Sequence, residues 1–94
     1  MIVHYYAIAE RGGGKTWWIS FPDGPGIYSA ADDAGEIVAQ AQDALASVVM
    51  HPGGDLPRSI EDGAPLPTDL SEFEQPAMVV VIPFDAEAEA REAA

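Results

Sequence analysis

The hydrophobic positions of this chain follow two different periods, and the change of period divides it into strands and one long helix. Residues 2–9 alternate, with Val3 and Tyr5 on one face and further apolar or aromatic side chains on the other. A period of two predicts a strand, and apolar groups on both faces indicate a central position in a sheet. Residues 16–21, rich in aromatic and β-branched side chains, predict a second strand, and residues 27–31 predict a third.

A turn that proline and glycine define follows the second strand. Residues 17–26 read W-W-I-S-F-P-D-G-P-G. Pro22 and Pro25 lack amide donors, so the strand has to stop there or lie at an edge of the sheet. Gly24 and Gly26 allow a sharp change of direction. The sequence therefore predicts a tight connection between the second and third strands.

Three consecutive glycines, residues 12–14, lie between the first two predicted strands. A glycine run can form a phosphate-binding loop, but such a loop opens a helix, and a strand-like segment follows here instead. The run therefore predicts a flexible hairpin connection.

From residue 34 onward the spacing of apolar positions changes to three and four. These positions are Ala34, Ile37, Val38, Ala41, Leu45, Val48 and Val49. Such a stripe predicts an amphipathic helix. Asp33 stands where an N-cap is expected, and Glu36 three residues later gives an acidic version of the capping box. His51, followed by P-G-G, predicts the end of the helix and would place its ring at the negative end of the helix dipole.

The remaining part of the chain predicts one more strand. Residues 78–82 read M-V-V-V-I, the most β-prone run of the sequence. A single helical turn is expected to begin at Ser59, and residues 64–75 are expected to form a loop. Residues 85–94 alternate alanine with charged side chains, which predicts a weak helix or a tail with little to bury.

The order β-β-β-α-β predicts an α+β fold, a four-stranded sheet with one main helix on one face. Three meandering strands followed by a helical crossover suggest that the fourth strand lies parallel to the first. The second face of the sheet would keep exposed aromatic side chains, so we expect a second copy or another partner to cover it.

The charge narrows the classes of partner. Sixteen acidic residues stand against four basic ones, a formal net charge of −12. Phosphate backbones repel such a surface, so direct nucleic-acid binding by this chain is not expected. A basic protein partner fits the charge, since complementary fields raise the encounter rate. A role in solubility alone is an equally weighted alternative.

The sequence also indicates a compartment. It has no cysteine, which excludes disulfides and thiolate metal sites and fits a reducing cytoplasm. No apolar run approaches the roughly 18 residues that span a bilayer, and the N-terminus shows no signal pattern. We therefore expect a cytoplasmic protein.

Five short motifs occur in one order along most of the chain. Residues 1–9 look like an opening strand, and residues 17–26 are similar to aromatic-x-V-S-F-P-D-L-P-G. Residues 31–36, A-D-D-A-G-E, are similar to G-D-T-x-E-E. Residues 40–45, Q-A-Q-D-A-L, look like N-A-x-E-A-L, and residues 61–67, E-D-G-A-P-L-P, are nearly E-D-G-x-P-L-P. In these motifs the chain resembles the HicB-like antitoxin family.

The resemblance implies a partial RNase H-like fold in which residues 1–85 form the antitoxin domain. Members of this family bind HicA-type toxins, small basic ribonucleases with a catalytic histidine, and block their active site. Many members also repress their own operon through a C-terminal DNA-binding module. Residues 86–94 resemble no such module and are expected to be an acidic tail. At Gly24 the family usually has leucine, so we expect a loosened turn that lacks an apolar contact.

The resulting prediction is an antitoxin that binds a HicA-type toxin, forms a homo-oligomer and has no catalytic activity, cofactor or metal of its own. The alternative is a HicB-like regulatory or scaffold domain without a toxin partner. A third, distant reading is a weak metal-dependent nuclease. RNase H chemistry needs several converging carboxylates, whereas the first strand carries only Glu10 at its end, and Asp33 is explained as a cap.

The residues expected to contact the partner are Trp17, Phe21, Asp23, Glu61 and Asp62. Trp17 and Trp18 must point to opposite faces of the sheet, one of them under the helix. Core packing is the more common role for either tryptophan, although aromatic residues are enriched at interface hot spots. Asp23 either meets a basic surface or holds its own turn. For Glu61 and Asp62 a capping or turn role is favoured over partner contact.

Overall fold

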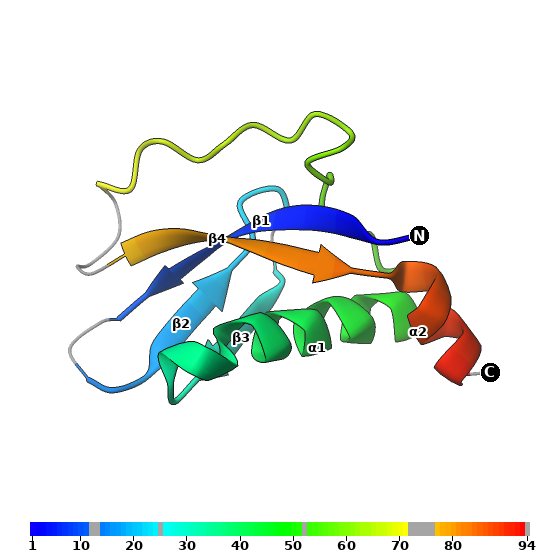
Figure 1. The fold of residues 1–94 in the computed structure, drawn as a ribbon, viewed down its shortest axis with the longest axis horizontal. Coiled ribbons are helices and arrows are strands. Elements are labelled where there is room, and N and C mark those ends of the chain that lie inside the picture. The colour runs from blue at the N-terminus through cyan, green and yellow to red at the C-terminus, as the bar shows by residue number, and fades with distance from the viewer. Residues whose placement is uncertain (12–13, 25, 52, 72–76, 94) are drawn as a thin grey trace.

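The computed structural model describes residues 1–11, 14–24, 26–51, 53–71 and 77–93 (Figure 1). Its elements are β1 (Val3–Glu10), β2 (Trp17–Ser20), β3 (Tyr28–Ala31), the 3₁₀ helix η1 (Ala34–Glu36), α1 (Ile37–Met50), β4 (Ala77–Phe84) and α2 (Ala86–Ala93). Predictions for Gly12, Gly13, Pro25, Pro52 and residues 72–76 concern positions outside the described residues. No helix in the described ranges is long and apolar enough to cross a membrane.

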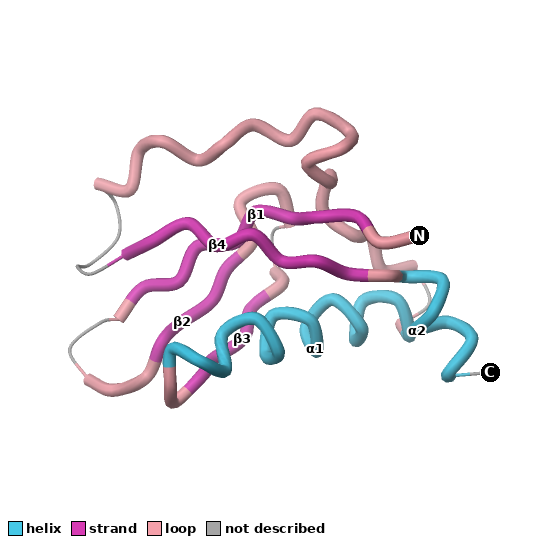
Figure 2. The backbone as a smooth tube through the Cα atoms, viewed as in Figure 1, coloured by secondary structure: helices cyan, strands magenta, loops and turns pink. Residues whose placement is uncertain are grey.

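The four strands form one sheet in the order β3-β2-β1-β4, and every neighbouring pair is antiparallel. The helix α1 lies on one face, and the long segment after α1 passes over the other (Figure 2). The α+β class and the β-β-β-α-β order predicted from the sequence are therefore confirmed.

The predicted direction of the fourth strand is wrong, because β4 runs antiparallel to β1 over its whole length, from Val3↔Phe84 to Glu10↔Ala77. A strand that followed α1 directly would have been parallel to β1. Instead, the segment from residue 53 to residue 71 carries the chain back along the sheet before β4 begins (Figure 1). The loop therefore reverses the direction that the helix alone would impose.

The core lies between α1 and the sheet. Leu45 and Ile82 are fully buried, and Ile19 lies beside them in the same cluster. Ala7 and Ala9 of β1 have no exposed surface and belong to the same cluster. Each buried Leu or Ile contributes about 1.5–3 kcal/mol relative to an exposed position. This face of the sheet therefore carries much of the stability of the fold.

Both predicted ends of the helix are confirmed, but the predicted capping box is wrong, because the Glu36 side chain makes no capping hydrogen bond within the described part of the chain. Asp33 has an extended backbone (φ −141°), and its Oδ1 accepts a hydrogen bond of 3.0 Å from Gly35 N. It caps the 3₁₀ turn η1, and α1 continues from there. At the other end His51 is the C-cap, and its N–H donates to the Val48 carbonyl. One stripe of apolar residues thus forms one continuous helical segment with a tighter first turn.

The turn expected at Ser59 is also present, as a pair of overlapping turns and not as a helix. The Ser59 carbonyl accepts hydrogen bonds from Asp62 N at 3.1 Å and from Ala64 N at 3.0 Å. Gly63 has φ +93°, a conformation that glycine adopts without strain. The glycine reverses the chain there and prevents a helix from continuing.

The expectation that Gly24 loosens its turn is wrong. Its N–H donates to the Phe21 carbonyl, and its own carbonyl accepts from Ile27 N, both at 3.0 Å. A Cβ at this position would lie 2.8 Å from Ile27 Cδ1 and 3.3 Å from the Cβ atoms of Phe21 and Pro57. Gly24 is buried, and its missing side chain is what allows these groups to pack closely.

The C-terminal segment forms the helix α2. Asp85 Oδ1 accepts a hydrogen bond from Ala88 N at 3.0 Å and lies 3.4 Å from the N-terminal amine of Met1. The bond from Ala88 lowers the pKa of the Asp85 carboxyl most, and the N-terminal amine adds to this effect. Ala86 packs against the core cluster. The helix is therefore tied to the domain at its start.

Candidate partner-binding surface

Trp17 and Trp18 lie on opposite faces of the sheet, as their alternation requires. Trp17 stands opposite Ala31 on the α1 side, is partly buried against the core, and carries the guanidinium of Arg11 at 5.9 Å from its ring centre. Trp18 points to the other face and is 54% exposed. Trp18 is therefore the more exposed of the two side chains, whereas Trp17 is partly buried and lines a depression with Arg11 and Lys15. Trp17 shares the face of Ile19, which α1 covers.

A second exposed aromatic residue, Tyr28, lies diagonally across from Trp18. In the pairing of β2 with β3, Trp18 stands opposite Ala30, and Ser20 stands opposite Tyr28. Tyr28 is 71% exposed. A hollow of about 370 Å³ lies here, which we call the aromatic hollow; its lining is Glu10, Trp18, Ile19, Ser20, Tyr28 and Ser29. Strand alternation in the sequence predicted exposed aromatic side chains on this face of the sheet, but the sequence analysis did not identify Tyr28 as one of them.

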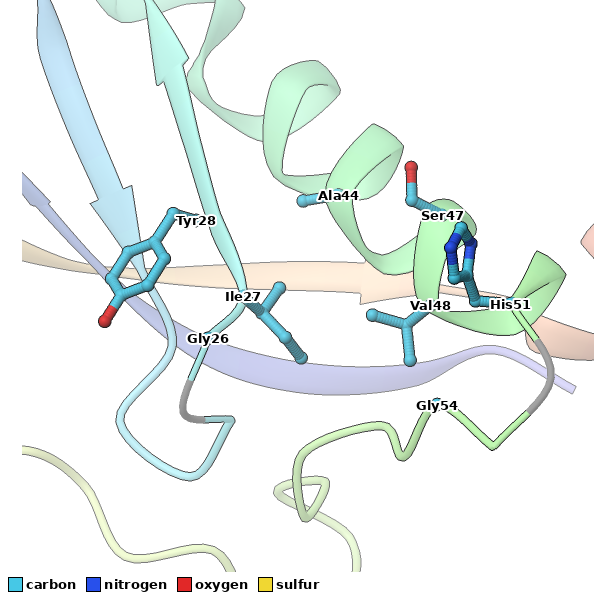
Figure 3. A pocket seen from close by; sticks show the side chains of 8 residues that line it. All are labelled: Gly26, Ile27, Tyr28, Ala44, Ser47, Val48, His51 and Gly54. Carbon is cyan, nitrogen blue, oxygen red and sulfur yellow. The ribbon is translucent and has the colours of Figure 1, made fainter.

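A second depression, the β3–α1 groove, lies on the other side of β3. It measures about 350 Å³, and its lining is Gly26, Ile27, Tyr28, Ala44, Ser47, Val48, His51 and Gly54. Figure 3 shows Ile27, Ala44 and Val48 around the space between β3 and the end of α1, while the ring of Tyr28 points away from α1. Tyr28 thus stands between two depressions at one edge of the sheet.

The chain that builds this edge is acidic. From residue 20 to residue 50 the sequence contains five acidic residues and no lysine or arginine. The acids are Asp23, Asp32, Asp33, Glu36 and Asp43. The C-terminal end of α1 adds the negative end of its dipole beside the β3–α1 groove. In space, part of this charge is balanced, because Arg58 pairs with Asp23, and Arg11 and Lys15 line the same depression as Asp32 and Asp33. The net charge of −12 still favours a cationic partner.

Phe21 and Asp23, two of the predicted contact residues, have partners inside the molecule. Phe21 is only 4% exposed and belongs to the core cluster, so a direct contact with a partner is corrected to a packing role. Phe21 follows β2 directly and lies on the face of the sheet that α1 covers, together with Ile19. Asp23 Oδ2 lies 3.3 Å from Arg58 Nη2 and 3.4 Å from Arg58 Nε. Such a surface pair contributes about 0–1 kcal/mol.

Glu61 attaches the long loop to β1. Its Oε1 accepts from His4 N at 2.8 Å, and its Oε2 lies 2.6 Å from His4 Nδ1. Ile60 N donates to the His4 carbonyl at 2.7 Å. The side-chain and backbone hydrogen bonds from His4 lower the pKa of Glu61 to about 2. The pairing of β2 reaches β1 only from Ile8 onward, so this loop satisfies backbone groups that β2 leaves at His4.

Asp62 is exposed, and its N–H donates to Ser59 Oγ at 3.1 Å. Burial, together with the charges of Asp62 and Glu61, raises the pKa of the Tyr5 hydroxyl. The positions of Glu61 and Asp62 therefore agree with the turn and anchoring role, and the Asp62 carboxylate stays accessible on the surface. Sequence reasoning missed the histidine and the arginine that fix this loop, because the His4–Glu61 and Arg58–Asp23 contacts each join residues far apart in the chain.

The carboxylates considered as ligands for a metal-dependent nuclease do not lie close together. Within the described ranges, no three His, Asp or Glu side chains come together as a possible metal site. Asp32 and Asp33 line a depression that also holds the bases Arg11 and Lys15. The carboxylates there face cationic side chains of the same chain.

No protein-family model and no curated protein matches the sequence. Among solved structures, a chain of one described as a HicA3 and HicB3 toxin-antitoxin complex is similar, with a TM-score of 0.56 and 20% sequence identity. The match covers 90% of this chain and 99% of that chain. The likeness shows that the two chains share a fold.

Proposed function

We propose that this protein is a HicB-like antitoxin that binds a small basic ribonuclease toxin of the HicA type and blocks it. The observation that carries the proposal is the fold, which the chain shares with a member of a complex between a toxin and an antitoxin. The five sequence motifs support the same family. The proposed protein acts in the cytoplasm by binding alone, without catalysis or a cofactor.

The charge supports the antitoxin's part in such a pair. A ribonuclease has to approach a polyanion, and a chain of net charge −12 is repelled by phosphates. His4, a residue with potential for acid-base chemistry, is held by Glu61 at 2.6 Å. An acidic protein is suited to cover the cationic surface with which a basic nuclease holds RNA.

The proposal includes a homo-oligomer. Its interface is placed at the outer edge of β4. This edge strand is eight residues long, contains no charged residue and exposes Val81 and Met78. An uncharged edge permits two strongly acidic copies to pair without opposing charges directly across the interface. Val81→Lys should then shift the protein to a monomer in sedimentation, and an unchanged molar mass would remove β4 from the interface.

The proposal is tested by co-expression with the small basic reading frame beside its gene. We expect that frame to arrest growth alone, and this chain to restore growth and to co-purify with its product. A harmless neighbour that does not co-purify would favour a stand-alone regulatory or scaffold domain. RNA cleavage by the pure protein with Mg²⁺ or Mn²⁺, lost on substitution of its acids, would favour the nuclease reading instead.

A further inference from the structure

The strand β3 combines three features that suit a binding site for an extended peptide. It is an edge of the sheet, so alternate residues direct unpaired N–H and C=O groups outward. The aromatic hollow lies on one side of it, and the β3–α1 groove lies on the other. Acidic residues surround it in sequence on both sides, with Asp23 before it and Asp32 after it.

We propose that β3 receives an extended segment of the basic partner as an added strand, with a lysine or arginine side chain in the aromatic hollow and an apolar side chain in the β3–α1 groove. The inference rests on the proposed antitoxin function and assigns the surface that this function uses. It therefore predicts a recognition sequence in which basic and apolar residues alternate.

The aromatic hollow has the composition of a cation site. Trp18 and Tyr28 are both exposed, and a guanidinium or ammonium group is attracted to the face of an aromatic ring. Glu10 and Ser20 line the same hollow and place oxygen atoms near the rings. An arginine fits best, because its planar group stacks on an aromatic ring while its N–H groups reach these oxygen atoms.

The β3–α1 groove has the composition of an apolar site. Ile27, Ala44 and Val48 form its walls, and Val48 is partly buried against the core. Side chains of an added strand alternate between the two faces of the sheet. A residue directed to the aromatic hollow is therefore followed by one directed to this groove. Main-chain hydrogen bonds to β3 provide affinity. The two depressions provide specificity for alternating basic and apolar side chains.

The charge of the molecule selects this occupant over a second copy. Two copies joined at β3 would bring together two chains that each carry a net charge of −12. Arg58 balances Asp23, but Glu36 and Asp43 of the segment after β3 add to the repulsion. Like charges placed against each other across an interface disfavour the complex. A cationic strand meets the same acids with attraction, which also raises its association rate.

The first test uses isotopically labelled protein and two synthetic peptides of one composition. One peptide, acetyl-KVRVRVK-amide, alternates basic and apolar residues, and the other, acetyl-KRRKVVV-amide, separates them. We expect the alternating peptide to shift the indole N–H of Trp18, leave that of Trp17 nearly unchanged and slow amide exchange in β3. Equal effects of both peptides, or shifts spread over all acidic surfaces, would show attraction by charge alone and overturn the proposal.

The second test uses variants of the folded chain against the same peptide and against the co-purified toxin. Trp18→Ala combined with Tyr28→Ala should weaken binding at least tenfold. The matched control Leu66→Ala removes an exposed apolar side chain from the loop, away from β3, and should change affinity less than twofold. For charge, Glu10→Gln should weaken binding more than Glu87→Gln, which alters the net charge equally but lies in α2.

The outcomes separate this inference from the function on which it rests. Toxin neutralisation that survives the Trp18→Ala, Tyr28→Ala double variant, with thermal unfolding unchanged, would overturn the β3 site and leave the antitoxin function standing. Pattern-dependent peptide binding at β3 without any toxin partner would leave the site standing and overturn the function. Self-association that disappears in the double variant would assign β3 to a second copy and contradict the proposal.

Discussion

The two faces of the sheet carry similar residues and have different surroundings. On the α1 side, Trp17 and Ile19 contribute to the core, and Trp17 is held by Arg11. On the other side Trp18, one position away, keeps about half of its surface exposed, beside the more exposed Tyr28. The difference shows that the parity of a position along a strand, and not its residue type, decides between stability and recognition.

The largest expected effect is on the covered face. Leu45→Ala removes a fully buried side chain from the centre of α1 and should lower the free energy of unfolding by about 2–5 kcal/mol. Denaturant unfolding measures this loss. Val38→Ala, a control at a more exposed position of the same helix, should cost much less. Equal losses at both positions would show that α1 is not packed on the sheet as described.

The second largest loss of stability is expected from a substitution in the turn before β3. Gly24→Ala places a Cβ 2.8 Å from Ile27 Cδ1 and should destabilise the protein by about 1–3 kcal/mol through overpacking. Gly14→Ala is the control, because a Cβ there has no neighbour within 4 Å. Thermal unfolding of the two variants checks the difference. A Gly24→Ala protein as stable as the parent would restore the interpretation of a loose turn.

The helix start should show a smaller effect. Asp33→Ala removes the side-chain bond to Gly35 N and should cost about 1 kcal/mol. Asp32→Ala alters the charge equally at the neighbouring position and serves as the control in the same denaturant series. If Asp32→Ala cost as much as Asp33→Ala, the cap would not be the cause.

The loop anchor predicts a dependence on pH. The pKa of Glu61 is lowered from 4.5 to about 2 in the folded protein, so its stabilising effect is fully present above the unfolded value and is lost as the pH falls through the folded value. The stability difference between the parent and Glu61→Gln should therefore shrink between about pH 4.5 and pH 2. A carboxyl NMR titration of Glu61 with its midpoint near 4.5 would contradict the His4 contact.

The smallest effect on stability belongs to the exposed face. Trp18→Ala should change the free energy of unfolding by less than about 1 kcal/mol, because Trp18 is 54% exposed and outside the core cluster. Trp17→Ala should cost clearly more, since it loses core contacts and the Arg11 stack. Denaturant unfolding of this pair measures the contrast between the faces, and a reversed order would invert the assignment.

Local patterns predicted the elements well, because each depends on neighbouring residues. The strand alternation, the stripe from Ala34 to Val49 and the Asp33 cap all reappear in the structure. The predicted direction of β4 is wrong, because the path of the long loop before it is set by tertiary contacts such as that of His4 with Glu61. The choice between Trp17 and Trp18 likewise depends on which face α1 covers, and that is fixed only by packing.

The most direct test of the central claim is inhibition of the purified toxin. Pure product of the neighbouring basic reading frame is allowed to cleave RNA while this protein is titrated into the reaction. The proposed function predicts that cleavage falls to the background at a fixed molar ratio, and that excess Trp18→Ala, Tyr28→Ala variant is needed to reach the same level. Undiminished cleavage in the presence of excess folded protein would contradict the account.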